Sequence, residues 1–295
     1  MKKIKNIIVP TDFSITARNA FQYAQGLAAA LDATLTVVHV REYFFPTSEE
    51  NFEPFAATEE TQLDEAFGIF IKENDTIGAG VMTKNKVKTQ ILRGNAVDSL
   101  LELSGQEDTD LIVIGTTGLQ DFLSRISGST SLKVATKAHC PVILVPREAA
   151  WMGIERIMYA SNYRSMTASM IGEATDFALQ VEAATHFVHI DSAGYEGDSS
   201  VEAIHWDKLF SSISPHLSYQ THSLYGTDII KELEKYSDAH RINLMVFVSK
   251  YRGFWESLRY KSVIQNMAIS TDIPMMYSIW RINGRKLNDP FKPKK

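Results

Sequence analysis

The feature that most constrains the fold of this chain is an internal repeat. Residues 7–12 (IIVPTD) recur as residues 157–162 (IMYASN), and residues 36–40 (TVVHV) recur as residues 186–190 (HFVHI), both with an offset of 150. After a shorter loop the offset becomes 133, which pairs residues 110–114 with 243–247 and residues 140–144 with 273–277. Because the order is kept throughout, the pattern indicates a duplicated domain.

A chain of 295 residues is long enough for two such domains. The repeat predicts one domain at residues 1–148, a second at 149–284 and a C-terminal tail at 285–295. Within the first repeat, short apolar runs alternate with helical patterns. The predicted strands lie at 7–10, 35–40, 87–91, 111–114 and 142–145, and the predicted helices include 96–103, 129–138 and one capped by Ser14. A Phe-rich stretch at 41–61 reads as a loop or lid, followed by a helix that carries Leu63, Phe67 and Phe70.

This alternation of strands and helices predicts an α/β fold, with right-handed crossovers and a parallel sheet between two layers of helices. Ligands in such folds bind beyond the carboxyl ends of the strands, where the strand order reverses. The residues that directly follow the first, second and fourth strands are therefore the first candidates for a binding site.

The loop after the fourth strand has the spacing G-x2-G-x9-G-[ST], and it opens a helix. Glycines let the backbone approach a ligand closely, and the free N–H groups and dipole of a helix start attract phosphate. Hydroxyl groups at the helix start add further donors. The loop predicts a phosphate site at Gly115, Gly118, Gly128, Ser129 and Thr130. A plain turn that binds nothing is the alternative.

The residues that follow the first strand, Pro10, Thr11 and Asp12, face the same predicted cleft. A carboxylate at this place can accept hydrogen bonds from ribose hydroxyls, and Val40 at the end of the second strand can form an apolar wall for a base. The alternative is that Asp12 only caps the helix that follows.

Taken in order, these motifs resemble a universal stress protein domain over nearly all of residues 1–147. The resemblance is carried by the sequence VPTDFS at 9–14, His39-Val40, Gly94 after the third strand, the glycine spacing and the sequence CPVILV at 140–145. It implies that each repeat has a Rossmann-like (adenine nucleotide alpha hydrolase-like) fold, a five-stranded parallel sheet with helices on both faces. It also implies a cleft for ATP, ADP or AMP, with or without magnesium.

The resemblance assigns the nucleotide-binding positions residue by residue. They are Pro10, Thr11, Asp12, Val40, Gly94, Ile114, Gly115, Gly118, Gly128, Ser129 and Thr130. One position departs from the pattern: many family members carry His or Arg just before the second glycine, where this chain has Thr117. The loss of a charged phosphate contact there would weaken affinity.

The second repeat has lost the glycine loop. Val248, Tyr251 and Lys261 stand where the first repeat has its three glycines, and Asn162 stands in place of Asp12. The second domain is therefore expected to be a degenerate copy, kept for structure or for binding a protein partner. Family members often dimerise through the edge strand, so residues 142–145 are expected to pair with residues 275–279 in an intramolecular pseudo-dimer; a homodimer is the other arrangement.

Composition narrows the function classes. A net charge of −5 gives no general attraction to nucleic acid or to an anionic membrane, the single cysteine, Cys140, fits a reducing compartment, and no apolar run reaches the ~20 residues of a membrane span. A cytoplasmic location is expected. His39 and Cys140 are expected to have structural roles.

No P-loop, catalytic nucleophile–base pair or magnesium-binding carboxylate pair is evident in the sequence, so no dedicated catalysis is expected. The favoured function is an ATP-binding regulatory module in a stress response. The alternatives are a scaffold that binds no nucleotide, and a slow ATPase with or without autophosphorylation at Ser129 or Thr130.

Overall fold

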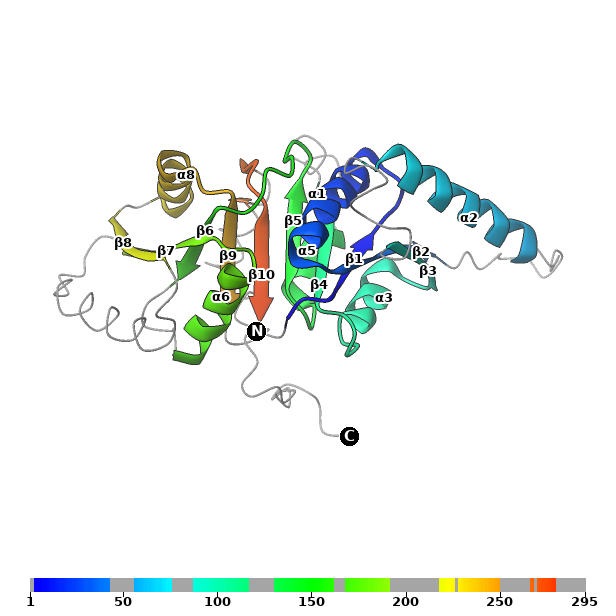
Figure 1. The fold of residues 1–295 in the computed structure, drawn as a ribbon, viewed down its shortest axis with the longest axis horizontal. Helices are drawn as coiled ribbons and strands as arrows, with labels where there is room; N and C mark the ends of the chain where they lie inside the picture. Colours follow the sequence, from blue (N-terminus) through cyan, green and yellow to red (C-terminus); the bar gives the residue numbers. More distant parts are fainter. Residues whose placement is uncertain are drawn as a thin grey trace. The chain divides into compact units, whose positions relative to one another are not determined.

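A computed structural model of the chain (Figure 1) describes residues 3–42, 56–75, 87–116, 130–161, 168–191, 218–225, 228–249, 266–267 and 270–279. The chain divides into two compact units. The first comprises Lys2–Gly153 together with Met267–Met276, and the second comprises Ile154–Asn266 together with Tyr277–Lys295 and the first residue.

The first unit alternates strands with helices, as the sequence predicts. Its elements are β1 (Asn6–Pro10), α1 (Ile15–Leu31), β2 (Thr34–Arg41), α2 (Ala56–Glu73), β3 (Val87–Arg93), α3 (Ala96–Leu103), β4 (Leu111–Thr116), α5 (Thr130–Lys137) and β5 (Val142–Pro146). The strands form a parallel sheet in the order β3-β2-β1-β4-β5. The strand order reverses between β3 and β4, so right-handed connections place α1 and α2 on one face of the sheet and α3 and α5 on the other.

The central strands are apolar along their whole length because helices cover both faces of the sheet. Ile7 and Val9 of β1 and Ile112 and Val113 of β4 have no exposed surface. Helix α1 packs along β1, β4 and β5. It begins as predicted at Ser14, whose Oγ accepts the N–H of Ala17 at 3.3 Å.

Helix α2 joins the same core through aromatic side chains. Phe70 packs on Phe21 of α1, and both Phe67 and Phe70 contact Phe13. The helix begins at Ala56 and Arg41 belongs to β2, so the loop expected over 41–61 is shorter at both ends. Residues 56–62 (AATEETQ) carry two alanines and two glutamates, which are good helix formers, and the prediction did not use this propensity. The rest of that stretch, residues 43–55, lies outside the described residues.

The second unit repeats this plan. Its elements are β6 (Arg156–Ser161), α6 (Ala168–Gln180), β7 (Ala184–Asp191), β8 (Tyr219–Tyr225), α8 (Ile229–His240), β9 (Leu244–Ser249) and the larger part of β10 (Met275–Ile279), which begins in the first unit. Strands β8, β7, β6 and β9 lie side by side and parallel, in the order that β3, β2, β1 and β4 have in the first unit. The ring of Tyr277 in β10 stacks on Phe247 of β9, with centroids 5.7 Å apart. The α/β fold with parallel sheets is therefore confirmed.

Details of backbone geometry also recur between the repeats. Asp32 after α1 and Glu182 after α6 both have left-handed φ angles, 53° and 56°. At the amino edge of the first sheet the Asp110 carboxylate accepts the N–H groups of Lys5 and Asn6, at 2.8 and 3.0 Å. In the second sheet Asn243 Oδ1 accepts the N–H groups of the equivalent residues 155 and 156, at 3.1 and 3.0 Å. We call this arrangement the amino-edge clamp.

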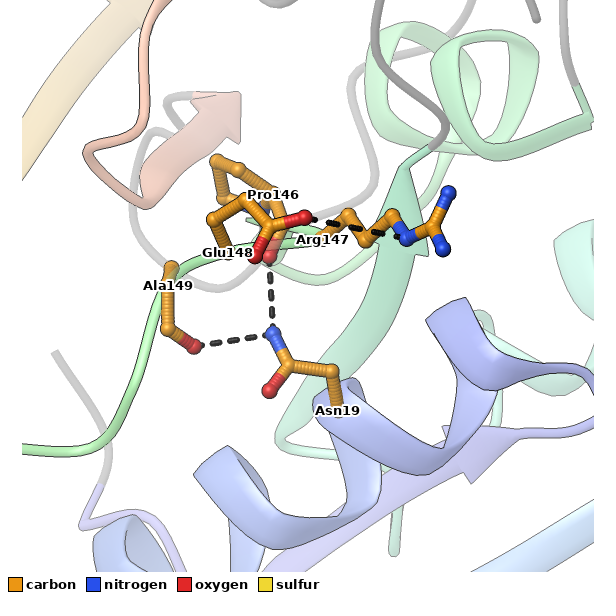
Figure 2. Close-up of polar contacts among 5 residues, drawn as sticks. All are labelled: Asn19, Pro146, Arg147, Glu148 and Ala149. Atoms are coloured by element: carbon orange, nitrogen blue, oxygen red, sulfur yellow. Dashed lines mark hydrogen bonds and ion pairs between the residues drawn. The ribbon is translucent and has the colours of Figure 1, made fainter.

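The chain leaving β5 is fixed to helix α1. The side-chain amide of Asn19 donates hydrogen bonds to the carbonyl oxygens of Pro146 and Ala149, both at 2.8 Å (Figure 2). Two residues further on, the ring of Trp151 lies against Gly26, where a Cβ atom would overlap the indole, and edge-on to Tyr23 at 5.1 Å.

Among the described residues no helix is long and apolar enough to cross a membrane.

Candidate functional site

The strand order reverses at β1 and β4, so a ligand-binding crevice is expected at the carboxyl ends of these two strands. Both strands are described in full, and their mutual pairing covers only Ile7–Ile8 opposite Leu111–Ile112. The pairing of β1 with β2 continues to Pro10, and that of β4 with β5 continues to Thr116. The two central strands therefore separate toward their carboxyl ends, and the predicted site residues of both strands border the gap.

The loop after β1 is held by hydrogen bonds of its own residues. Thr11 is buried, its N–H donates to Val38 at 2.8 Å, and its Oγ1 accepts the N–H of Phe13 at 2.9 Å. Phe13 has a left-handed φ of 62°, which turns the chain sharply before α1. The carboxylate of Asp12 is exposed, and its Oδ1 accepts the N–H of Ser14 at 3.0 Å.

These bonds separate the roles of neighbouring residues. Ser14, rather than Asp12, is the N-cap of α1. Asp12 closes the turn in front of the helix through one oxygen and stays at the surface. The arrangement fixes a carboxylate at the mouth of the expected crevice, two residues before the N-cap of a 17-residue helix and so near its positive end. Thr11 supports this turn, because its N–H, its carbonyl and its hydroxyl all bond within the protein.

His39 has the structural role that the sequence suggests. Its Nδ1 lies 2.8 Å from the carbonyl oxygen of Thr11, and its ring packs on Phe13 with centroids 5.0 Å apart. The histidine thus ties the end of β2 to the loop that carries Asp12. Next to it, Val40 is half-buried and pairs with Leu92 of β3, at the same edge of the sheet.

Gly94 follows β3 with a φ of 136°, a conformation that L side chains rarely adopt. Its N–H donates to the carbonyl of Arg41 at 2.9 Å, which brings the ends of β2 and β3 together. Both Val40 and Gly94 therefore lie at the carboxyl edge where the sequence places them, on β2 two strands away from β4 and after β3 three strands away from it.

The glycine at the end of β4 has a packing role that the sequence analysis did not predict, and its predicted approach to a phosphate stays a prediction. A Cβ atom on Gly115 would overlap the backbone carbonyl of Thr16, in the first turn of α1. Gly115 therefore lets α1 approach β4 closely, and its carbonyl accepts a 2.6 Å hydrogen bond from Ser131 Oγ in α5. The preceding Ile114 is buried. One glycine thereby brings the starts of two helices to the same strand end.

Thr130 opens α5 and is exposed, as a hydroxyl donor at this edge requires. Gly118, Gly128 and Ser129 lie outside the described residues, so their place in the site stays a prediction. The same holds for Asn162, Tyr251 and Lys261 of the second repeat.

Sequence reasoning missed three contributors to this site: Phe13, Thr16 and Ser131. Phe13 contributes through its left-handed backbone angle and Thr16 through its carbonyl oxygen. Neither property can be inferred from the type of the residue. Ser131 bonds to the Gly115 carbonyl 16 residues earlier, so its role depends on the packing of α5 beside β4 and is not marked in the neighbouring sequence.

The sequence of the first repeat matches the family model described as the universal stress protein family, over residues 3–146. A universal stress protein of Thermus aquaticus is 33% identical over 144 residues, which are 48% of this chain and 98% of that protein. One from Methanocaldococcus jannaschii is 29% identical over 146 residues, which are 48% of this chain and 82% of that protein.

The likeness in fold extends over both repeats. The crystal structure of a universal stress protein from Archaeoglobus fulgidus superposes with a TM-score of 0.71, covering 94% of this chain and 98% of that chain. Its sequence identity is 14%, so the match bears on the fold alone. Taken with the match of the first repeat to a relative that it covers almost completely, these comparisons show that the chain belongs to the universal stress protein family.

Proposed function

We propose that the first repeat binds an adenine nucleotide, ATP, ADP or AMP with or without magnesium, and that the chain is a nucleotide-responsive regulatory protein of the stress response. The observation that carries the proposal is the convergence at the crevice between β1 and β4. The exposed carboxylate of Asp12 and the starts of α1 and α5 meet there, with Gly115 as the shared packing point.

Each part of this arrangement suits one part of a nucleotide. Asp12 is anchored by the N–H of Ser14 through Oδ1, and as an exposed carboxylate it keeps acceptor capacity for two ribose hydroxyls. The starts of two helices favour a polyphosphate through their N–H groups and dipoles. The half-buried Val40 offers an apolar surface for the base.

In the second repeat the residue equivalent to Asp12 is Asn162, and the three loop glycines are replaced. We therefore propose that this repeat binds no nucleotide in the same way and acts as a structural or partner-binding copy. The predicted pairing of residues 142–145 with 275–279 belongs to this proposal.

The proposal is tested by isothermal titration of the full chain with ATP, ADP and AMP. Asp12→Ala removes a charged acceptor, which contributes about 1.5–3 kcal/mol per hydrogen-bonded group, so affinity should fall roughly tenfold to a hundredfold. The matched control is Asp108→Ala, which makes the same charge change at an exposed residue beside the amino edge of the sheet, where Asp108 bonds through its backbone alone.

The titrations, together with two further measurements on the same proteins, separate the alternatives. No heat of binding in the wild-type chain, together with no nucleotide released from acid-denatured protein, would favour the scaffold. Phosphate release from ATP that is abolished in Asp12→Ala would favour the slow ATPase. Equal affinity in Asp12→Ala and Asp108→Ala would contradict the assignment of Asp12.

A further inference from the structure

Three histidines and a tyrosine form a layer between the sheet and helix α8 in the second unit. His186 lies on β7, His222 on β8, and Tyr236 and His240 on α8. His186 is 4% exposed and its Nδ1 lies 2.8 Å from the hydroxyl of Tyr236, which is 6% exposed. We call these four residues the histidine layer.

Each of the four rings of this layer packs against the other three. His240 stacks on Tyr236 with centroids 4.0 Å apart, and its Nδ1 lies 3.0 Å from the Tyr236 carbonyl oxygen. His222 has its centroid 5.0 Å from Tyr236, 5.5 Å from His240 and 6.1 Å from His186. The ring centroids of His186 and His240 are 5.5 Å apart. A proton gained by one imidazole therefore lies beside the other two.

The charged groups around His186 do not offset such a proton. Strand β6 contributes Arg156, β8 contributes His222 and α8 contributes His240, and all three lower the pKa of His186. The half-buried carboxylates on α8 are Glu232, which pairs with Lys235 at 2.8 Å, and Glu234. On β6, Met158 pairs with His186 across the sheet and accepts a hydrogen bond from Ser237 of α8.

Burial, followed by His240, His222 and Arg156, lowers the pKa of His186 from 6.5 to about 4. Burial and then His240 also lower the pKa of His222. A lowered histidine pKa means that the folded state holds the neutral ring. The stability from this ring is complete above about pH 6.5 and declines as the pH falls toward about 4.

From this cluster we infer that the histidine layer is an acid-sensitive latch, which holds α8 on the sheet of the second repeat at neutral pH and releases it under mild acid. The layer is not a metal site, since no group of three or more His, Cys, Asp or Glu among the described residues is arranged to hold a metal ion. The inference is independent of nucleotide binding in the first repeat.

The test is hydrogen exchange of the full chain, followed by mass spectrometry at pH 7.5 and 5.5 in EDTA, with labelling times scaled to intrinsic exchange. This window lies above the usual pKa range of carboxylates. A histidine with these pKa values should raise the opening of α8 roughly tenfold between the two conditions. Peptides from α1 and β1 in the first repeat are the internal reference. Unchanged protection of α8, or an equal loss in α1, would overturn the inference.

Two variants tie the effect to the layer. The double variant His186→Phe and Tyr236→Phe replaces both partners of the buried hydrogen bond by apolar rings, so packing is kept and the part of the pH response of α8 that comes from His186 should be lost. His240→Gln changes a half-buried position and removes the ring that, after burial, lowers the pKa of His186 most, so the pKa of His186 should rise and the response of α8 should become smaller than in wild type. The matched control is His139→Gln, at a half-buried histidine of the first repeat, which should respond as wild type. A full response in either layer variant would contradict the latch.

Discussion

Among the described residues, the two repeats are alike at the amino edges of their sheets and differ in where their polar side chains cluster. The amino-edge clamp is the same in both, with Asp110 in one repeat and Asn243 in the other accepting two backbone N–H groups. The first repeat gathers polar groups at the carboxyl edge, around Asp12. The second gathers them under α8, in the histidine layer.

The residues equivalent to the histidine layer show how far the repeats have diverged. Sheet register pairs Val38 with Gln90 in the first unit and Val188 with His222 in the second, so Gln90 is the counterpart of His222. The 150-residue offset makes Thr36 the counterpart of His186. Counted from the helix caps Asn95 and Asp228, the counterparts of Tyr236 and His240 are Leu103 and Glu107. None of the four is histidine or tyrosine. The two copies therefore have the same strands and helices but different side chains between the sheet and this helix.

The largest expected effect tests the close packing that the first repeat requires at its carboxyl edge. Gly115→Ala places a Cβ atom against the Thr16 carbonyl, and backbone cannot move aside as a side chain can. We expect the free energy of unfolding to fall by about 3 kcal/mol, measured by urea denaturation. Gly68→Ala is the control, because a Cβ there meets nothing within 4 Å and a helical alanine stabilises by up to about 1 kcal/mol. Equal stability of the two variants would remove the packing role of Gly115.

A second pair of variants tests whether the amino-edge clamp contributes equally to the stability of both repeats. Asp110→Ala removes a carboxylate that accepts two N–H groups, and Asn243→Ala removes an amide oxygen that does the same. Since hydrogen bonds to charged acceptors are stronger, we expect losses of about 2 and about 1 kcal/mol. Hydrogen exchange of β1 and β6 measures each repeat separately. A larger loss from Asn243→Ala would reverse the comparison.

The smallest effect concerns the caps of the equivalent helices α3 and α8. Asn95 accepts the N–H groups of Val97 and Asp98, and Asp228 accepts that of Lys231. We expect Asn95→Ala and Asp228→Ala each to cost about 1 kcal/mol at low salt. The Asp228 effect should fall to roughly half that in 1 M salt, because part of it is the attraction of a charge to the helix dipole. Equal salt dependence of the two effects would show that this charge does not contribute.

Much of the framework could be predicted, because it depends on periodicity and order. The strands of the first repeat, the cap at Ser14 and the structural role of His39 all agree with the sequence analysis. These features are local, or they follow from the rule that connections in parallel sheets are right-handed.

The packing role of Gly115 was not predicted, since its neighbour is the Thr16 carbonyl of α1, which lies about 100 residues earlier and whose approach depends on the packing of the whole helix. The histidine layer was missed for a similar reason. His186, His222 and His240 are far apart in the chain, and only the strand order and the docking of α8 bring them together.

The attachment of residues 146–151 to α1 has a practical consequence. Trp151 lies against Gly26 and edge-on to the buried ring of Tyr23, beside the carbonyls that Asn19 holds. An indole emits at longer wavelength when water replaces such neighbours, so this residue is a native fluorophore at the exit from the first repeat. Replacing the other three of the four tryptophans by phenylalanine would isolate its signal. Detachment of residues 146–151 from α1 could then be followed by tryptophan fluorescence alone.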